Sequence, residues 1–242
     1  MSGARRRALT AGSIAIIAAA ALGLAAIRRE RKPLPLRPAS DRPALLLLTS
    51  LPLVFSEDFS LNGGSPALKR LEGRYRVVPI SVSSPGELAK GGLLLMAQPL
   101  AQTAENLVTL DEWVRGGGRV LLLADPLLEW PSKRPLGDPS RPPPMFADTG
   151  LLGHWGLRLD TPDAPGTAVR RLAGYRVVTV SPGALYGSCS ISPDRLVADC
   201  RLGKGEAIVV ADADFIGTDK LRDGGAHNLD ALVATLARLE RK

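Results

Sequence analysis

The chain has 242 residues, of which 45% are hydrophobic and 23% charged, so it is long and apolar enough to fold around a buried core. Its net charge of +7 lies almost wholly in residues 1–32, because the remaining residues carry 24 Lys and Arg against 23 Asp and Glu. With no basic surface and only 4% aromatic residues for base stacking, the folded part is not expected to bind nucleic acid.

An uncharged, alanine-rich run over residues 8–27 is flanked on both sides by arginines. It has about the 20 residues that an α-helix needs to cross a bilayer, so residues 1–32 are predicted to be one transmembrane helix with basic flanks. A cleaved signal peptide and an ordinary buried helix are the alternatives. Basic residues lie at both ends of the run, so charge alone does not decide its orientation.

Proline-rich residues 33–43 predict an extended linker, and residues 44–242 predict one α/β domain. In this domain short apolar runs alternate with helical patterns, which is typical of a mostly parallel sheet with helices on both faces. Pro79 predicts that its strand lies at or near a sheet edge, because proline cannot donate a ladder hydrogen bond. The first half of the domain predicts strands over 44–52, 76–82, 91–99 and 119–126, and helices over 65–75 and 103–115.

Three consecutive glycines at 116–118 resemble a phosphate-binding loop. A phosphate loop, however, follows a strand and precedes a helix, whose N-terminus supplies the amide donors. Here the order is reversed, so Gly116 or Gly117 is predicted to end a helix in the left-handed conformation.

The second half of the domain begins with a long Pro- and Gly-rich loop over residues 127–162, which includes a short helix and a strand near its end. Residues 175–216 then predict successive strands, with a hairpin turn at "SPDR", and residues 226–242 an amphipathic helix.

Several stretches, in this order and spacing, resemble the GldG-like family of bacterial ABC-transporter auxiliary proteins: "LDEWVRGGGRVLLLADP", "PLGDP" with "LLGHWGL", and "GKGEAIVVADADFIGTD" with "HNLDALVATL". The resemblance implies a flavodoxin-like domain, similar to class I glutamine amidotransferases but without their catalysis. It also implies a periplasmic domain held at the inner membrane by a single span. The expected function is a non-catalytic binding or scaffold module whose partner is a transporter permease or ATPase.

Catalytic residues of the amidotransferase type are not found in the sequence. Such hydrolases place a Cys or Ser nucleophile on a sharp turn after a central strand, with a histidine base later in the chain. The corresponding strand here ends with Met96, Ala97 and Gln98, and the two histidines are His154 and His227. The chain is therefore predicted not to be an enzyme and to need no cofactor, with a degenerate amidotransferase-like hydrolase as the alternative.

Acidic residues follow two of the predicted buried strands. Asp125 ends one strand, and Asp212 and Asp214 end another. If the strands are neighbours, the carboxylates share the crevice where open parallel sheets bind ligands, joined by Asp138 from the long loop. A ligand or partner site there is one interpretation, and a Mg²⁺ or Ca²⁺ site is a weaker one. Capping is the other: Asp125, followed by Pro126, would cap the start of a helix, and Asp212 with Asp214 would cap the turn after their strand.

Trp130, His154 and Trp155 flank the long loop and complete the candidate partner or ligand site. The tryptophans would supply stacking surfaces for a periplasmic polysaccharide-binding domain, which is a further alternative. Burial in the core or anchoring of the loop would explain them equally well.

Cys189 and Cys200 are the only cysteines and flank the predicted hairpin. A turn centred on Pro193 and Asp194 would pair Cys189 with Ala198 and leave the cysteines as diagonal neighbours, slightly beyond disulfide reach. A bulge or a change of register would then be needed for a bond. The predicted periplasmic location favours a disulfide, and two buried thiols are the alternative.

Overall fold

The structure is a computed structural model that describes residues 32–55, 64–135, 137–219, 221 and 225–240. The chain divides into two units, Met1–Lys32 and Pro33–Lys242. The predicted membrane span over residues 8–27 lies outside the described residues. Within the described ranges, no helix has the length and hydropathy of a membrane span.

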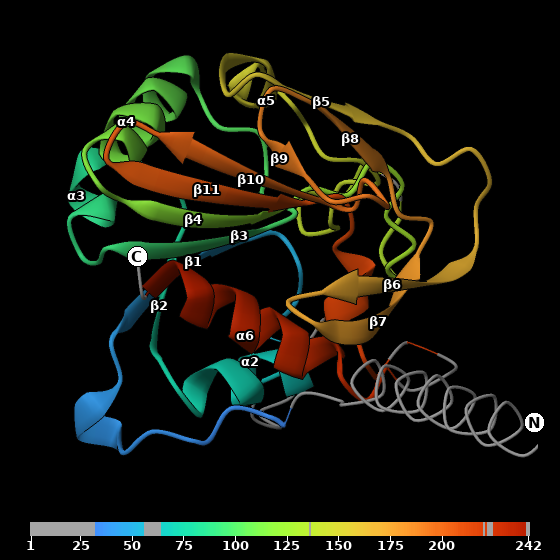
Figure 1. The fold of residues 1–242 in the computed structure, drawn as a ribbon, viewed down its shortest axis with the longest axis horizontal. Helices are drawn as coiled ribbons and strands as arrows, with labels where there is room; N and C mark the ends of the chain where they lie inside the picture. Colours follow the sequence, from blue (N-terminus) through green and yellow to red (C-terminus); the bar gives the residue numbers. More distant parts are fainter. Residues whose placement is uncertain (1–31, 56–63, 136, 220, 222–224, 241–242) are drawn as a thin grey trace, which may run out of the picture. The chain divides into compact units, whose positions relative to one another are not determined.

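A seven-stranded sheet runs through the second unit in the order β2-β1-β3-β4-β11-β10-β9 (Figure 1). The first five strands in this order are parallel, and β10 and β9 are antiparallel to their neighbours. The prediction of a mixed α/β domain with a mostly parallel central sheet is therefore confirmed. The strands are β1 (Ala44–Thr49), β2 (Arg76–Ile80), β3 (Leu93–Ala97), β4 (Arg119–Leu123), β9 (Ser190–Ile191), β10 (Val197–Leu202) and β11 (Gly205–Val210).

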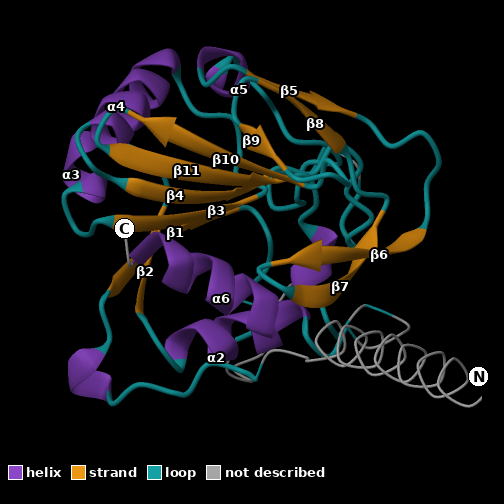
Figure 2. Cartoon of the chain, in the orientation of Figure 1, coloured by secondary structure: helices purple, strands orange, loops and turns teal. Residues whose placement is uncertain are grey.

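Helices cover both faces of this sheet (Figure 2). One face packs against α2 (Pro66–Glu72) and α6 (Asn228–Glu240). The other packs against α3 (Pro85–Leu88), α4 (Ala104–Arg115) and α5 (Leu151–His154). Strands β3 and β11 are buried at every position, as expected of parallel strands covered on both sides.

Local sequence signals set several of these boundaries. Ser65 and Thr103 accept hydrogen bonds from the backbone N–H three residues later and so cap α2 and α4. Gly117 follows α4 with a φ of +123°, as the order of helix, glycines and strand predicted. Pro79 lies in β2, which is an edge strand of the sheet, and this prediction is confirmed.

The second half of the domain adds two small antiparallel sheets beside the main one (Figure 1). The first pairs β5 (Leu157–Asp160) with β8 (Ala184–Gly187), and the second pairs β6 (Thr167–Leu172) with β7 (Tyr175–Val180). The sequence patterns did not predict β6. Its exposed positions are Thr167, Val169 and Arg171, which show no apolar alternation, and the strand contacts α6 from a distant part of the chain.

Residues expected to form a linker contact the domain. Arg37 donates to both carboxylate oxygens of Glu240 at 2.9 and 2.8 Å, and its backbone N–H donates to the Gly73 carbonyl at 2.9 Å. The Arg70 side chain donates to the Leu34 carbonyl at 3.2 Å. These contacts join the start of the second unit to both helices of one face.

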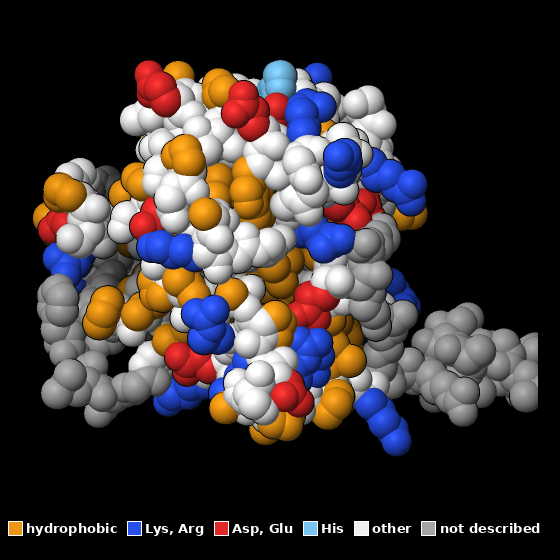
Figure 3. All heavy atoms as spheres, turned by 90° about the vertical axis from the view of Figure 1, so that its left-hand side faces the viewer, with side chains coloured by type: hydrophobic (Ala, Val, Ile, Leu, Met, Phe, Trp, Pro, Cys, Tyr) orange, Lys and Arg blue, Asp and Glu red, His pale blue; other side chains and the backbone are white. Residues whose placement is uncertain are grey.

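Charged side chains are mixed on the face of the molecule shown in Figure 3, which is the end where the parallel strands begin. Basic, acidic and apolar groups alternate there and form no large patch of one sign. This distribution agrees with the near-neutral charge of the sequence after residue 32.

Removal of residues 33–43 should destabilise the domain, because the bidentate Arg37–Glu240 pair and the backbone contacts of this segment would be lost. Compared with a chain that begins at residue 33, a chain that begins at residue 44 should lose about 2 kcal/mol of unfolding free energy, or about 4–8 °C in melting temperature. Thermal denaturation of the two chains by circular dichroism tests this. Equal melting temperatures would show that the segment is only a spacer.

Candidate functional site

The carboxyl ends of the five parallel strands meet at one edge of the sheet. The chain passes from β1 outward to β2 and then returns to the other side of β1 with β3, so the strand order reverses between β1 and β3. In open α/β sheets this reversal point is where ligands ordinarily bind. The residues that follow β1, β3, β4 and β11 therefore decide what this edge can do.

Gln98 occupies the position directly after β3, at the reversal point. Its φ of +44° is unusual for a residue with a side chain and marks a sharp turn. The side chain is buried, and its amide exchanges hydrogen bonds with the Asp125 backbone: it accepts from N–H at 2.9 Å and donates to the carbonyl at 3.2 Å. It also donates to the Pro143 carbonyl at 3.2 Å, while Ser50 after β1 donates to the Gln98 carbonyl. The polar groups of Gln98, at the reversal point, are thus bonded to other groups of the protein.

Asp125 lies just beyond β4, and its carboxylate serves the backbone of two loops. One oxygen accepts from the Leu127 N–H at 2.9 Å in an Asx-turn, and the other accepts from the Ala213 N–H at 2.7 Å. No helix follows Asp125, so the expected helix cap is replaced by this turn. The carboxylate bridges the ends of β4 and β11.

Asp212 and Asp214 follow β11 and are also bonded to backbone amides. Asp212 accepts from the Phe215 N–H at 2.7 Å and from the Val180 N–H of β7 at 2.9 Å. Asp214 accepts from the Glu129 N–H at 2.7 Å. The structure therefore brings Asp125, Asp212 and Asp214 together, as predicted, and uses each of them to cap turns and loops.

Burial dominates the electrostatics of these carboxylates. Asp125 and Asp212 have no exposed surface, and Asp214 is 6% exposed. Loss of hydration raises the pKa of Asp125 to about 6 and that of Asp214 to about 7. The pKa of Asp212 is raised well above its ordinary value, first by burial and then by the Asp125 charge. No metal-binding group of His, Cys, Asp or Glu occurs among the described residues.

Asp138 and Trp130, also predicted for this site, lie in the loop after β4. Asp138 accepts from the Ser140 N–H at 2.8 Å and lies 3.6 Å from the Arg134 guanidinium, so its bonds remain within the loop. Trp130 is 7% exposed and packs closely on Gly217, where a Cβ would lie 2.8 Å from its ring. It anchors the loop and offers little surface for stacking a ligand.

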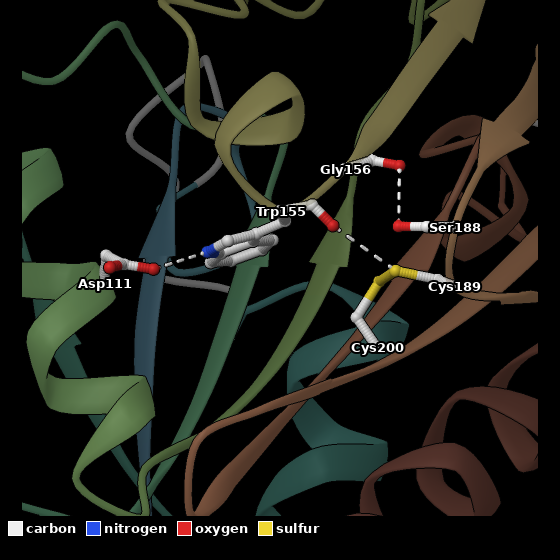
Figure 4. The surroundings of a disulfide bond; sticks show 6 residues. All are labelled: Asp111, Trp155, Gly156, Ser188, Cys189 and Cys200. Atoms are coloured by element: carbon white, nitrogen blue, oxygen red, sulfur yellow. Dashed lines mark hydrogen bonds between the residues drawn. A yellow bond between two sulfur atoms is a disulfide. The ribbon is translucent and has the colours of Figure 1, made fainter.

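His154 and Trp155 belong to a second cluster, on the α4 side of the sheet. The Trp155 indole donates to Asp111 of α4 at 3.0 Å, and Figure 4 shows this pair near the disulfide. Asp111 also accepts from Arg115 at 2.7 Å and lies 3.2 Å from His154 Nε2. Hydrogen bonds from Arg115 and Trp155 outweigh partial burial and lower the Asp111 pKa.

A cavity of about 640 Å³ lies beside this cluster and is lined by His154, Trp155 and Cys189, among others. Trp155 itself is buried, and its indole N–H is used by Asp111, so the ring serves chiefly as packing. Asp199 and Arg201 of β10 also line this cavity.

Cys189 and Cys200 are joined in a disulfide, with their Cα atoms 4.9 Å apart. The pairing of Ile191 with Ala198 and of Ser190 with Asp199 places Cys189 directly opposite Cys200. The predicted pairing of Cys189 with Ala198 is therefore wrong by two residues. The hairpin loop is longer than predicted because Arg195 adopts a left-handed φ of +58° and Leu196 leaves the hairpin to enter the core.

Three polar residues important to these clusters were missed by the sequence patterns. Asn228, at the start of α6, exchanges hydrogen bonds with Val178 of β7 at 2.9 and 2.8 Å, as a neighbouring strand would. Glu129 accepts a hydrogen bond from Ser181. Of these three residues, only Asp111 could have been found from the sequence, because it is an acidic residue in the otherwise apolar stripe of α4.

No family model and no curated protein sequence matches the chain. Among solved structures it is similar to the mmIFT52 N-terminal domain, with a TM-score of 0.54, 16% identity and coverage of 82% of this chain and 98% of that domain. The cytoplasmic protein STM3548 from Salmonella typhimurium gives a TM-score of 0.52 at 11% identity, with coverage of 81% and 98%.

Part of a larger enzyme is similar as well. The exo-beta-1,4-mannosidase Op5Man5 from Opitutaceae bacterium strain TAV5 gives a TM-score of 0.52 at 14% identity. The match covers 81% of this chain but only 36% of the mannosidase, so the chain spans about a third of that protein's length. At these identities the similarity describes the fold alone.

The raised pKa values predict that the domain is most stable in mild acid. Asp125 and Asp214 bind protons more tightly in the folded chain than in the unfolded chain, where an aspartate titrates near 3.8. The unfolding free energy should therefore fall as pH rises from about 4 to about 8, by about 1 kcal/mol per pH unit for each group that titrates. Denaturant unfolding across this range measures the slope.

The variant Asp214→Asn should reduce this slope and be more stable than the wild type at pH 8, because an amide keeps an acceptor for the Glu129 N–H without a buried charge. The matched control is Asp163→Asn, which changes an exposed carboxylate and should leave the slope unaltered. A wild-type stability that is constant or rises over this range contradicts the assignment.

Proposed function

We propose that the chain is a membrane-anchored binding or scaffold module of an ABC-type transport system, with no catalytic machinery of its own. The observation that supports the proposal is that a buried, hydrogen-bonded side chain, that of Gln98, lies at the reversal point between β1 and β3. This side chain is held by the backbone of Asp125 and Pro143. A substrate would have to displace a buried, fully bonded amide to reach this position.

The fold in its finer description is flavodoxin-like and similar to that of class I amidotransferases. The parallel strands follow the order 2-1-3-4 and then β11, which corresponds to the flavodoxin order. Hydrolases of the amidotransferase type carry their nucleophile on a strained turn after a central strand. Here the turn after β3 has the positive φ of such an elbow, but it carries an amide side chain. This combination supports a fold that retains the elbow and uses it for structure.

Association with a transport system rests on the resemblance to the GldG-like auxiliary family and on the predicted span over residues 8–27. The Cys189–Cys200 disulfide supports an oxidising compartment, because disulfides persist mainly outside the cytosol. The proposed arrangement has the N-terminus in the cytoplasm, one span in the inner membrane and the α/β domain in the periplasm.

Purification of the full-length chain from native membranes in a mild detergent tests the proposed function. The permease and ATPase subunits of one ABC-type transporter should co-purify in comparable amounts, as quantified by mass spectrometry. The matched control replaces residues 8–27 by an unrelated span. Because the domain is proposed to carry the binding surface, this variant should retain the same partners.

Two results would refute the proposal. The first is the absence of transporter subunits above the level found with an unrelated single-span protein. The second is hydrolysis of an amide or ester substrate that is lost in the variant His154→Ala. That result would favour a hydrolase that uses the His154–Asp111 pair.

Thiol labelling of intact cells tests the topology. A membrane-impermeant maleimide should label the chain only after a reductant has been added, because Cys189 and Cys200 are bonded to each other and face the periplasm. The double variant with serine at both positions is the control for specificity. Labelling that needs cell lysis but no reductant would place the domain in the cytoplasm with free thiols.

A further inference from the structure

Among the described strands, β6 has a partner along one edge only. Its partner is β7, in an antiparallel register that joins Ala168 to Thr179 and Val169 to Val178. The far edge of β7 is occupied by side chains, since Val178 N–H donates to Asn228 and Val180 N–H donates to Asp212. The ribbon therefore has one edge tied to the domain and one edge, formed by β6, that no described strand covers.

The pattern of these bonds identifies which groups of β6 point outward. Residues on an antiparallel strand bond alternately to one side and the other. Since Val178 and Val180 bond away from β6, their partners Val169 and Thr167 bond away from β7. Arg171 continues the same alternation. Among the described residues, no group forms a hydrogen bond with the backbone N–H or carbonyl of these three outward positions.

The side chains of the outward-bonding positions of β6 lie on one face of the β6–β7 ribbon, and they are partly apolar and partly basic. Val169 is 52% exposed and lies opposite Val178. Arg171 lies directly opposite Arg176, although like charges in this position repel each other. No ion pair joins either arginine, or the neighbouring Arg170, to a described residue. The free edge thus carries positive charge that the described part of the domain does not neutralise.

A cavity of about 550 Å³ borders the same strand. Thr167, Ala168 and Arg170 of β6 line it, together with Tyr186, Arg195 and the three aspartates Asp160, Asp163 and Asp194. Because of these carboxylates the cavity does not suit acidic side chains, and Val169 and Arg171 lie outside its lining. Arg195 is already engaged there, since it donates to the Tyr186 hydroxyl at 2.5 Å and stacks on that ring.

We propose that β6 is a docking edge for an extended, acidic segment of a partner protein, which adds to the β6–β7 ribbon as a third strand. The outward N–H and carbonyl groups would supply the ladder hydrogen bonds, Val169 an apolar contact, and Arg171 with Arg176 a site for a carboxylate. A lipid surface would satisfy the arginines but not the ladder groups. A second copy of the chain would satisfy the ladder groups but bring two arginine clusters together.

This inference deepens the proposed binding role and rests on it, but its test needs no transporter, so the two can fail separately. The full-length chain in detergent is titrated against a fluorescein-labelled heptapeptide of alternating valine and glutamate, and binding is followed by fluorescence anisotropy. The wild type should bind this peptide at least tenfold more tightly than the matched peptide of alternating valine and lysine. Affinity should fall as salt is raised, since charge contributes to it.

Two variants distinguish the contribution of the ladder hydrogen bonds to binding from the contribution of the arginine charge. Val169→Pro removes one outward N–H while leaving the bonds to β7, and should weaken binding at least tenfold, whereas Val169→Thr retains the donor and should bind as the wild type does. Arg171→Glu should weaken binding to a similar extent and remove the preference for the acidic peptide, because the new carboxylate would pair with Arg176 opposite it. Its matched control, Lys204→Glu, reverses an exposed charge in the β10–β11 turn and should have no effect.

Melting temperatures of all the variants show whether each one is folded, and the arginine variant decides the question if the proline variant is not. The proposal is overturned if the acidic peptide does not bind at millimolar concentration, or if binding is indifferent to both Val169→Pro and Arg171→Glu. It is also overturned if the chain forms dimers that Val169→Pro dissociates, because the occupant of the edge would then be a second copy. Binding to anionic vesicles that only Arg171→Glu weakens would instead identify a lipid surface.

Discussion

Buried backbone N–H groups beyond the ends of β4 and β11 need acceptors, and the carboxylates of Asp125 and Asp212 provide them. This requirement organises the carboxyl edge of the sheet. Asp125 fastens the loop after β4 to the end of β11, and Asp212 fastens β7 to the same place. Burial of these carboxylates disfavours their charged form, and it raises the pKa of Asp125 to about 6. An edge that commonly binds ligands in such sheets is here occupied by the bonds that hold its own loops.

The strained turn at Gln98 belongs to the same arrangement. A residue with a side chain and a φ of +44° is unfavourable in isolation, and the surrounding hydrogen bonds to Asp125 and Pro143 hold it in place. The polar groups of Gln98 are already bonded, so groups without partners have to be sought on other surfaces of the domain. The open edge of β6 is one, since its ladder groups and arginines have no partners among the described residues.

The sequence predicted the parallel half of the fold closely, because its signals are local. Continuous apolar runs such as Leu93–Ala97 are typical of strands buried on both faces, and Ser65, Thr103 and Gly117 mark helix ends by their own hydrogen bonds or φ. It also predicted that Asp125, Asp212 and Asp214 would meet. What it could not predict was their orientation, since the amides they accept from belong to residues as distant as Ala213 and Val180.

The antiparallel half was less predictable for the same reason. Strand β6 alternates exposed and half-buried residues and includes two arginines, and it is stabilised by α6 from the end of the chain. The register of the β9–β10 hairpin depends on a left-handed Arg195, which is not a residue type that favours this conformation.

We infer that this domain binds its proposed partner through surfaces away from the carboxyl edge of the sheet. Hydrogen–deuterium exchange of the full-length chain, alone and together with the proposed transporter partner, tests this inference. We expect slower exchange in the presence of the partner at the outward amides of Thr167, Val169 and Arg171, with no change at Gln98, Asp125 or Ala213. Protection confined to the loops after β3, β4 and β11, with β6 unchanged, would contradict it.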